Sequence, residues 1–144
     1  MNMKEYTVKV FEDGSKYWCK NGQLHREDGP AIEYADGTKI WYKNGQRHRE
    51  DGPAAEYDDG TKSWFVNGKL HREDGPALEL AANGTKSWFV NGQRHREDGP
   101  AIECADGTKE WWLNGREVTE QEVLGTCSGK IVEIDGIKYK LTLA

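Results

Sequence analysis

The sequence of 144 residues contains no long apolar run, and its N-terminus lacks the apolar stretch of a secretory signal. A helix that spans a bilayer needs about 20 mostly apolar residues, and an export signal needs a shorter apolar stretch behind a basic N-terminus. The sequence therefore predicts a protein that neither spans a membrane nor is secreted by the usual signal.

Cysteine is scarce as well. Cys19, Cys104 and Cys127 are an odd number of thiols, and none of them belongs to a C-x-x-C motif. Such a set indicates free thiols in a reducing compartment rather than a disulfide framework. We therefore expect the protein to be cytoplasmic.

An excess of charge of one sign is also missing. The chain has 20 Lys and Arg against 25 Asp and Glu, a net charge of −5, and the two signs are interspersed. Nucleic acids and anionic membranes both attract basic patches, so this pattern predicts no nucleic-acid partner and no membrane partner. The interspersed lysines also argue against an acidic decoy for a DNA-binding protein.

What the sequence does contain is a repeat of 23 residues, and such a fixed period is typical of repeat architectures. One unit reads DGTKIWYKNGQRHREDGPAAEYD, and the one extra residue in the array lies in the segment LAANG, where we expect a turn. The tryptophans at this period are Trp18, Trp41, Trp64, Trp88 and Trp111. The histidines at the same period are His25, His48, His71 and His95.

Each unit carries two turn signals, an Asn-Gly pair and an Asp-Gly pair that becomes Asn83-Gly84 in one unit. Asn-Gly predicts a two-residue hairpin turn, and Asp-Gly a type I turn closed by a glycine bulge. The runs between the turns resemble strands, and no window keeps the 3.6-residue period of a helix. We therefore predict an all-β fold, an elongated single-domain meander of about five 23-residue β-hairpin repeats in a twisted antiparallel sheet.

The turns also predict a register. The Asp-Gly turn places a glutamate opposite a lysine, and such cross-strand pairs stabilise a sheet by roughly 0.2–1 kcal/mol each. The expected pairs are Glu33–Lys39, Glu56–Lys62 and Glu103–Lys109. The Asn-Gly turn places each Trp of the repeat opposite the His seven residues later, with Val118 opposite Trp111. One face then carries the Trp row. The other carries Cys19, Tyr42, Phe65, Phe89 and Trp112.

The two ends depart from the repeat, as the ends of repeat arrays must if their edges are to be covered. We predict an N-terminal capping strand in residues 1–12, the array in residues 13–115, and a C-terminal cap in residues 116–144. The cap begins with TEQE, a capping box in which Thr119 and Glu122 start a short helix that ends at Gly125. An alternating segment around Asp135-Gly136 then predicts a final hairpin.

The stretch YKNGQRHREDGPAAEYDDGTKSWFVNG resembles the MORN repeat, with its aromatic, NG, H, G, Y and DG pattern. It is most similar to the variant with W-x-x-NG-x-x-HR-x-DGPA units that occurs in bacterial and bacteriophage proteins. Ordinary MORN units have extra glycines where this chain has REDGPA. The resemblance implies a hairpin array without a catalytic centre that binds proteins and sometimes lipids. It further suggests a phage-encoded inhibitor or adaptor in the host cytoplasm, acting on a host protein such as a bacterial defence component.

The motif HREDGPA occurs four times and brings an imidazole, a guanidinium and two carboxylates close together. Equivalent histidines of successive hairpins would lie roughly 9–10 Å apart, whereas zinc ligands lie about 2 Å from one ion. Within one unit, His48 and Asp51 are too few ligands, and no Ser, Cys or Thr nucleophile recurs with the motif. We therefore expect no metal, no cofactor and no enzymatic activity.

Architecture explains the motif better. Pro53 suits the start of a strand, and Gly52 permits the turn before it. We expect Asp51 to accept backbone N–H groups or an arginine of the neighbouring unit, and the arginines to form a bidentate ladder with acidic groups across the repeats. We expect each imidazole to pack flat on its Trp partner.

A thin sheet leaves one aromatic row poorly covered, and exposed apolar patches mark interaction sites. We therefore expect a non-catalytic scaffold with a protein partner. The candidate binding residues are Arg49 and Arg72 for charge contacts and Phe65, Phe89 and Trp112 as apolar anchors. The alternative is a protein that sequesters nucleotides or sugars between Trp faces and Arg tips. The oligomeric state stays open, a homodimer included.

Overall fold

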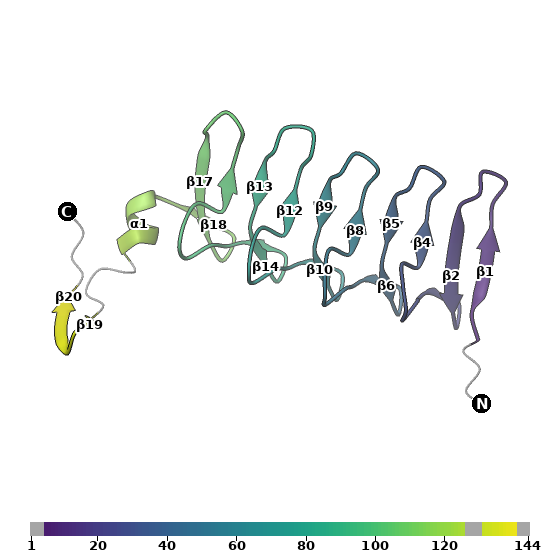
Figure 1. Cartoon of the computed structure of the whole chain (residues 1–144), viewed down its shortest axis with the longest axis horizontal. Coiled ribbons are helices and arrows are strands. Elements are labelled where there is room, and N and C mark those ends of the chain that lie inside the picture. The colour runs from purple at the N-terminus through teal and green to yellow at the C-terminus, as the bar shows by residue number, and fades with distance from the viewer. Residues whose placement is uncertain (1–4, 126–130, 141–144) are drawn as a thin grey trace.

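The structure, a computed structural model, describes residues 5–125 and 131–140. Their regular elements are short β-strands and the helix α1 (Glu120–Gly125). Figure 1 shows an elongated row of hairpins that begins with β1 (Thr7–Val10) and reaches α1 near the other end. The predicted all-β meander is therefore confirmed.

One antiparallel sheet of twelve strands runs through the array. After β1, its strands are β2 (Lys16–Lys20), β3 (Gln23–Leu24), β4 (Ile32–Glu33), β5 (Lys39–Ile40), β8 (Ala55–Glu56), β9 (Lys62–Ser63), β12 (Leu78–Glu79), β13 (Lys86–Ser87), β16 (Ile102–Glu103), β17 (Lys109–Leu113) and β18 (Arg116–Val118). The order in space is β1-β2-β4-β5-β8-β9-β12-β13-β16-β17-β18, with β3 beside β2. The sheet therefore follows the chain, as in a meander.

The Asn-Gly turns close further hairpins along one side of this sheet (Figure 1). The separate pairs are β6 (Tyr42–Lys43) with β7 (Gln46–Arg47), β10 (Phe65–Val66) with β11 (Lys69–Leu70), and β14 (Phe89–Val90) with β15 (Gln93–Arg94). Asn44 and Gly45 have φ values of 50° and 78°, the two positive values of a type I′ turn. The Asn-Gly prediction is therefore confirmed.

The Asp-Gly turns form the other ends of the hairpins. Asp36 accepts the backbone N–H of Thr38 through Oδ1 at 2.8 Å, and Gly37 has a φ of 98°. The extra residue of the LAANG segment lies in the turn between β12 and β13, where Gly84 donates its N–H to the carbonyl of Leu80. The insertion therefore lengthens a turn and leaves the strands unchanged, as predicted.

The predicted register is confirmed, and it extends across the sheet. Glu33 pairs with Lys39 inside one hairpin, and Lys39 pairs with Glu56 of the next. The same alternation continues along the whole row, which consists of Lys16, Glu33, Lys39, Glu56, Lys62, Glu79, Lys86, Glu103 and Lys109. Every member therefore has an opposite charge on a neighbouring strand.

The core lies on the opposite face of these strands and is thin. Ile32 and Ile40 are each 4% exposed, and Ala55 is fully buried. The side chains packed against them are the half-buried Tyr17, Leu24, Tyr42 and Tyr57. These four side chains form the outer cover of the core, so they keep part of their surface in water.

The two ends differ from the repeat as expected. β1 pairs with β2, which confirms the N-terminal strand. Thr119 and Glu122 exchange backbone-to-side-chain hydrogen bonds of 2.7 and 3.2 Å, which confirms the capping box. α1 contacts β17 and buries Val123 completely. The hairpin of β19 (Ile131–Ile134) and β20 (Ile137–Lys140) stands beyond α1 (Figure 1).

Candidate functional site

The tryptophans of the repeat form a row on the same face as the charged row, and we call this face the tryptophan face. The backbone N–H of Trp41 donates to the carbonyl of Ala54 on the next hairpin at 2.8 Å, and Trp18, Trp64 and Trp88 make the equivalent backbone bonds. Ala54 and its equivalents are fully buried. A larger side chain at this position would meet the indole of the neighbouring strand, because adjacent Cβ atoms lie about 5 Å apart.

In the four units that contain HREDGPA, the indole carries a guanidinium. Cζ of Arg49 lies 3.9 Å from the ring centroid of Trp41, and the equivalent distances are 3.9–4.0 Å in the other three units that contain HREDGPA. The group stacked on the tryptophan is therefore the arginine that follows the histidine. We had expected the imidazole to pack on this ring, and the structure places a guanidinium over it.

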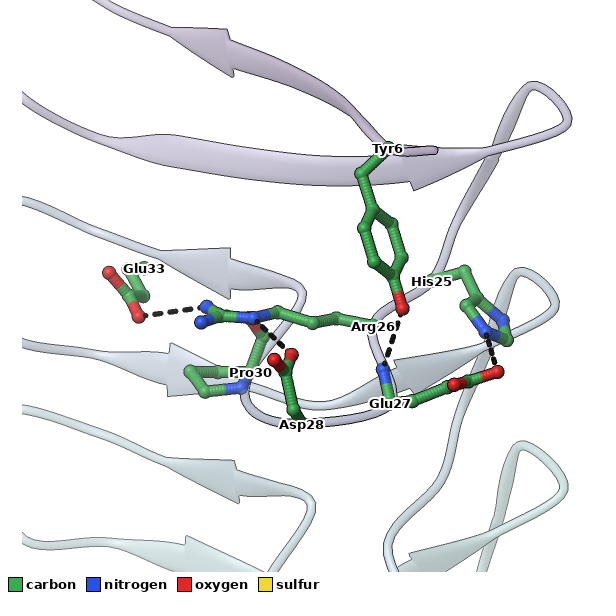
Figure 2. Close-up of polar contacts among 7 residues, drawn as sticks. All are labelled: Tyr6, His25, Arg26, Glu27, Asp28, Pro30 and Glu33. Carbon is green, nitrogen blue, oxygen red and sulfur yellow. Dashed lines mark hydrogen bonds and ion pairs between the residues drawn. The ribbon is translucent and has the colours of Figure 1, made fainter. Parts of the chain in front are cut away.

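The same arginine holds its own loop together. Nε of Arg49 donates to Oδ1 of Asp51 at 3.0 Å, and Nη1 donates to the carbonyl of Pro53 at 3.1 Å and to Glu56 at 3.0 Å. Figure 2 shows the same arrangement around Arg26. We call this set of contacts the arginine clamp. Its acceptors belong to the arginine's own unit, so the predicted ladder between units was wrong.

The glycine of HREDGPA makes room for the clamp. A Cβ on Gly52 would lie 3.0 Å from Cζ of Arg49, and the equivalent distances in the other units are 2.8–3.0 Å. This glycine lacks the positive φ of the turn glycines. We predicted that Gly52 permits a turn; the structure adds that its missing side chain lets the guanidinium approach.

The histidines join neighbouring units. Nδ1 of His48 accepts the backbone N–H of Asn67 in the next hairpin at 3.0 Å, and the other three histidines make the same bond. Nδ1 is thus unprotonated, and Nε2 of His48 lies 3.4 Å from Glu50. Each of these imidazoles therefore links its own unit to the next one.

Open clefts separate successive clamps on this side. Three of them have volumes of about 850, 710 and 750 Å³. Exposed carboxylates line them, and the side chains of Glu73 and Asp74 are 84% and 87% exposed. A hydrogen bond from Arg72 lowers the pKa of Asp74, so this carboxylate keeps its charge. The clefts thus present negative charge to solvent.

The opposite face carries the second aromatic row, Tyr42, Phe65, Phe89 and Trp112, all half-buried. Two further arginines lie over this row. Cζ of Arg47 is 5.3 Å from the ring centroid of Phe65, and Cζ of Arg94 is 4.9 Å from that of Trp112. The sequence analysis missed Arg47 and Arg94, although the register places them directly opposite Tyr42 and Phe89.

Four tyrosines gather around Arg47 on this face. Arg47 donates from Nε to the Tyr42 hydroxyl at 3.4 Å, and the rings of Tyr17 and Tyr34 meet edge to face at 5.8 Å. A side-chain hydrogen bond with Tyr17, together with burial, raises the pKa of Tyr34 to about 12. We call Tyr17, Tyr34, Tyr42, Tyr57 and Arg47 the tyrosine–arginine patch. It is a group of polar-tipped rings, and Tyr34 is 37% exposed.

The predicted binding residues thus lie on two different faces. Arg49 and Arg72 lie on the tryptophan face, where each donates three hydrogen bonds within its own clamp. Phe65, Phe89 and Trp112 stand on the opposite face. One partner surface that touches a single face cannot contact both sets, so the structure does not bring them together.

Residues 5–125 and 131–140 contain no group of three His, Cys, Asp or Glu side chains arranged to hold a metal ion. Cys19 and Cys104 are free thiols, while Cys127 lies outside the described residues. None of the helical segments described is both long and apolar enough to cross a bilayer. Neither the protein-family models nor the curated proteins include a match to this chain. The resemblance to MORN repeats therefore stays a hypothesis.

Proposed function

We propose that the chain is a non-catalytic scaffold that binds another protein through the face of the second aromatic row. One observation carries this proposal. The face presents a continuous row of half-buried rings, with Arg47 and Arg94 lying over two of them. Tyrosine and arginine are among the residue types that contribute most to binding at protein interfaces.

The tryptophan face is less suited to this task. Each of its clamped indoles is already covered by a guanidinium, and each clamp side chain such as Arg49 is only 23% exposed. The charged row beside it pairs lysine with glutamate at every strand, so few charges are left for a partner. A partner on this face would have to break contacts that stabilise the array. On the opposite face it would add contacts to rings that are partly exposed.

The partner that fits is an extended protein surface. Equivalent rings of successive units lie roughly 9–10 Å apart, because two strands separate them. Several units therefore present a strip roughly 40 Å long. The MORN-like repeat supports a more specific proposal, a phage-encoded inhibitor or adaptor that acts on a host protein such as a defence component in the host cytoplasm.

Two single variants, one on each face, test which face binds the partner. Arg47→Ala removes the charge at the centre of the tyrosine–arginine patch, whereas Lys62→Ala changes only the charged row of the tryptophan face. We expect a protein captured by the wild-type chain from its native host to be lost with Arg47→Ala and kept with Lys62→Ala, while both variants melt as cooperatively as the wild type. Loss with Lys62→Ala alone would move the binding site to the tryptophan face.

The alternative is a protein that sequesters a small ligand, and the three clefts between units favour it. The ligand would be a nucleotide or a sugar, because each cleft offers a tryptophan and arginines beside its exposed carboxylates. A thermal-shift screen of metabolites tests this alternative. A compound that raises the melting temperature in the absence of any protein would favour sequestration over protein binding.

A further inference from the structure

Among the residues that the structure describes, β1 is an edge strand of the sheet. It pairs with β2 on one side and stands at the end of the strand order. Phe11 donates its N–H to the carbonyl of Ser15, and residues of an antiparallel strand alternate in the side to which their peptide groups point. The peptide groups of Val8 and Val10 therefore point away from β2. These two valines are 43% and 66% exposed.

Inside the array the equivalent edge is always covered. Val10 occupies the position that Glu33 occupies in the next hairpin, since Val10 pairs with Lys16 as Glu33 pairs with Lys39. At that internal edge Glu33 faces Lys16 of the preceding hairpin. β1 thus has the geometry of an interface between hairpins, but its charged residue is replaced by valine.

This replacement indicates what covers the edge. Between successive hairpins, two different strands meet, so a lysine can face a glutamate. Between two copies of one chain related by a two-fold axis through β1, a residue at the axis meets itself, so a charge there would be repelled. A glutamate beside the axis would find no lysine opposite, because Lys9 of β1 points to the other face. Uncharged Val8 and Val10 suit such a self-complementary edge. We propose that two copies of this chain join through antiparallel pairing of β1 with β1 of the partner copy.

The alternation of side chains restricts the register of this pair. Val8 and Val10 point to the tryptophan face, as shown by their partners Trp18 and Lys16. The outward peptide groups can pair Val8 with Val8, Val8 with Val10, or Val10 with Val10 of the partner copy, and the last of these overlaps the two β1 strands at Val10 alone. The second register places Lys9 opposite Lys9 of the partner copy, where the charges repel. The first places Lys9 opposite Thr7 of the partner copy, so the two-fold axis passes beside Val8.

The symmetry of this interface limits assembly to a dimer. α1 contacts β17, and its Val123 is completely buried there. An interface that uses the same strand in both copies closes on itself and does not propagate. The assembly is therefore a continuous sheet through two arrays, with an α1 at each end. This inference does not depend on the proposed function, because the face of the second aromatic row remains free in the dimer.

Sedimentation equilibrium of the full chain with two charged variants tests the dimer. The wild-type chain should change from about 16.3 kDa to about twice that mass as concentration rises. Val8→Glu and Val8→Lys should each be monomeric, because each places like charges at the axis. An equimolar mixture of the two should recover the dimer, because the charges are then opposite. Ile137→Lys, on the terminal hairpin, is the matched control and should dimerise as the wild type does.

Each other outcome overturns the proposal. A wild-type chain that remains monomeric up to about 1 mM has no such interface. Loss of association in Ile137→Lys would assign the contact to the hairpin of β19 and β20. A mixture of Val8→Glu and Val8→Lys that stays monomeric, with both variants folded by circular dichroism, would exclude a two-fold axis at this residue.

Discussion

Replacing Arg49 by methionine tests whether the arginine clamp holds each unit together. Methionine keeps the unbranched apolar stem that lies along Trp41 and removes the guanidinium with all its hydrogen bonds. The variant should fold to the same array, because the turns and strand pairs on either side are unchanged. It should be less stable, because the ring, the Pro53 carbonyl and the Glu56 carboxylate all lose a partner.

The magnitude follows from the four contacts. A guanidinium 3.9 Å from an indole centroid and 23% exposed contributes about 1 kcal/mol. The bond to the Pro53 carbonyl contributes about 1 kcal/mol. The Glu56 carboxylate is 39% exposed, and its ion pair contributes about a few tenths of a kcal/mol. The Asp51 carboxylate is 87% exposed and contributes close to nothing. We expect a loss of about 2 kcal/mol in all, and a melting temperature lower by about 4–8 °C for a chain of this length.

Thermal unfolding followed by circular dichroism measures this shift. Arg72→Met is an internal replicate, because its stacking distance of 4.0 Å and its hydrogen bonds are nearly the same. Arg116→Met is the matched control, since Arg116 is 70% exposed and its ion pair with Glu122 is 3.8 Å long. The melting temperature of this variant should stay near that of the wild type. If Arg49→Met has the same melting temperature as the Arg116→Met control, the clamp does not stabilise the unit and our reasoning is refuted.

Three further changes test other contacts. Gly75→Ala would put a Cβ 2.9 Å from Cζ of Arg72 and push the guanidinium off its indole. It should lower the free energy of unfolding by about 1–3 kcal/mol, measured by chemical denaturation. An unchanged midpoint would show that the loop accommodates the Cβ without losing stability. His71→Ala should lower the free energy of unfolding by about 1 kcal/mol, because it removes one hydrogen bond between units and the backbone N–H of Asn91 can then bond to water. A loss as large as that of a buried ring would contradict this. The bond with Tyr17 raises the pKa of Tyr34 to about 12, above the ordinary value of about 10. The neutral phenol is thus favoured in the folded state, so its stabilisation is complete below pH of about 10 and is lost as the pH rises towards 12. Tyr34→Phe should remove this alkaline loss, and equal alkaline melting of both proteins would speak against the bond.

Much of the fold could be predicted from local signals. The Asn-Gly and Asp-Gly pairs determine which residues lie opposite each other. The pairs Glu33–Lys39 and Trp–His could therefore be predicted by counting residues outward from each turn. The capping box at Thr119 is likewise a local signal with a local reason. Once the register is known, alternation along each strand assigns the two faces, and this placed the tryptophans and the second aromatic row correctly.

The side-chain contacts were harder to predict because they depend on the path of the EDGP loop. The sequence places Arg49 next to His48, and the strand register alone puts the histidine nearer to the tryptophan. The loop turns the guanidinium back onto the indole and directs the imidazole to the next unit instead. Only the three-dimensional path shows that Pro53 and Glu56 become acceptors within the same unit. Arg47 could have been found, since it directly opposes Tyr42 in the predicted hairpin.

The clamp has a consequence for how such a chain can change length during evolution. Every clamp uses acceptors of its own 23-residue unit, and every histidine bonds a backbone N–H that all units supply at the same place. A gene segment that encodes one unit can therefore be duplicated or deleted in register, because the new neighbours offer the same contacts as the old ones. The second aromatic row would then lengthen or shorten by one ring at a time, while the specialised strands at the two ends stay as they are.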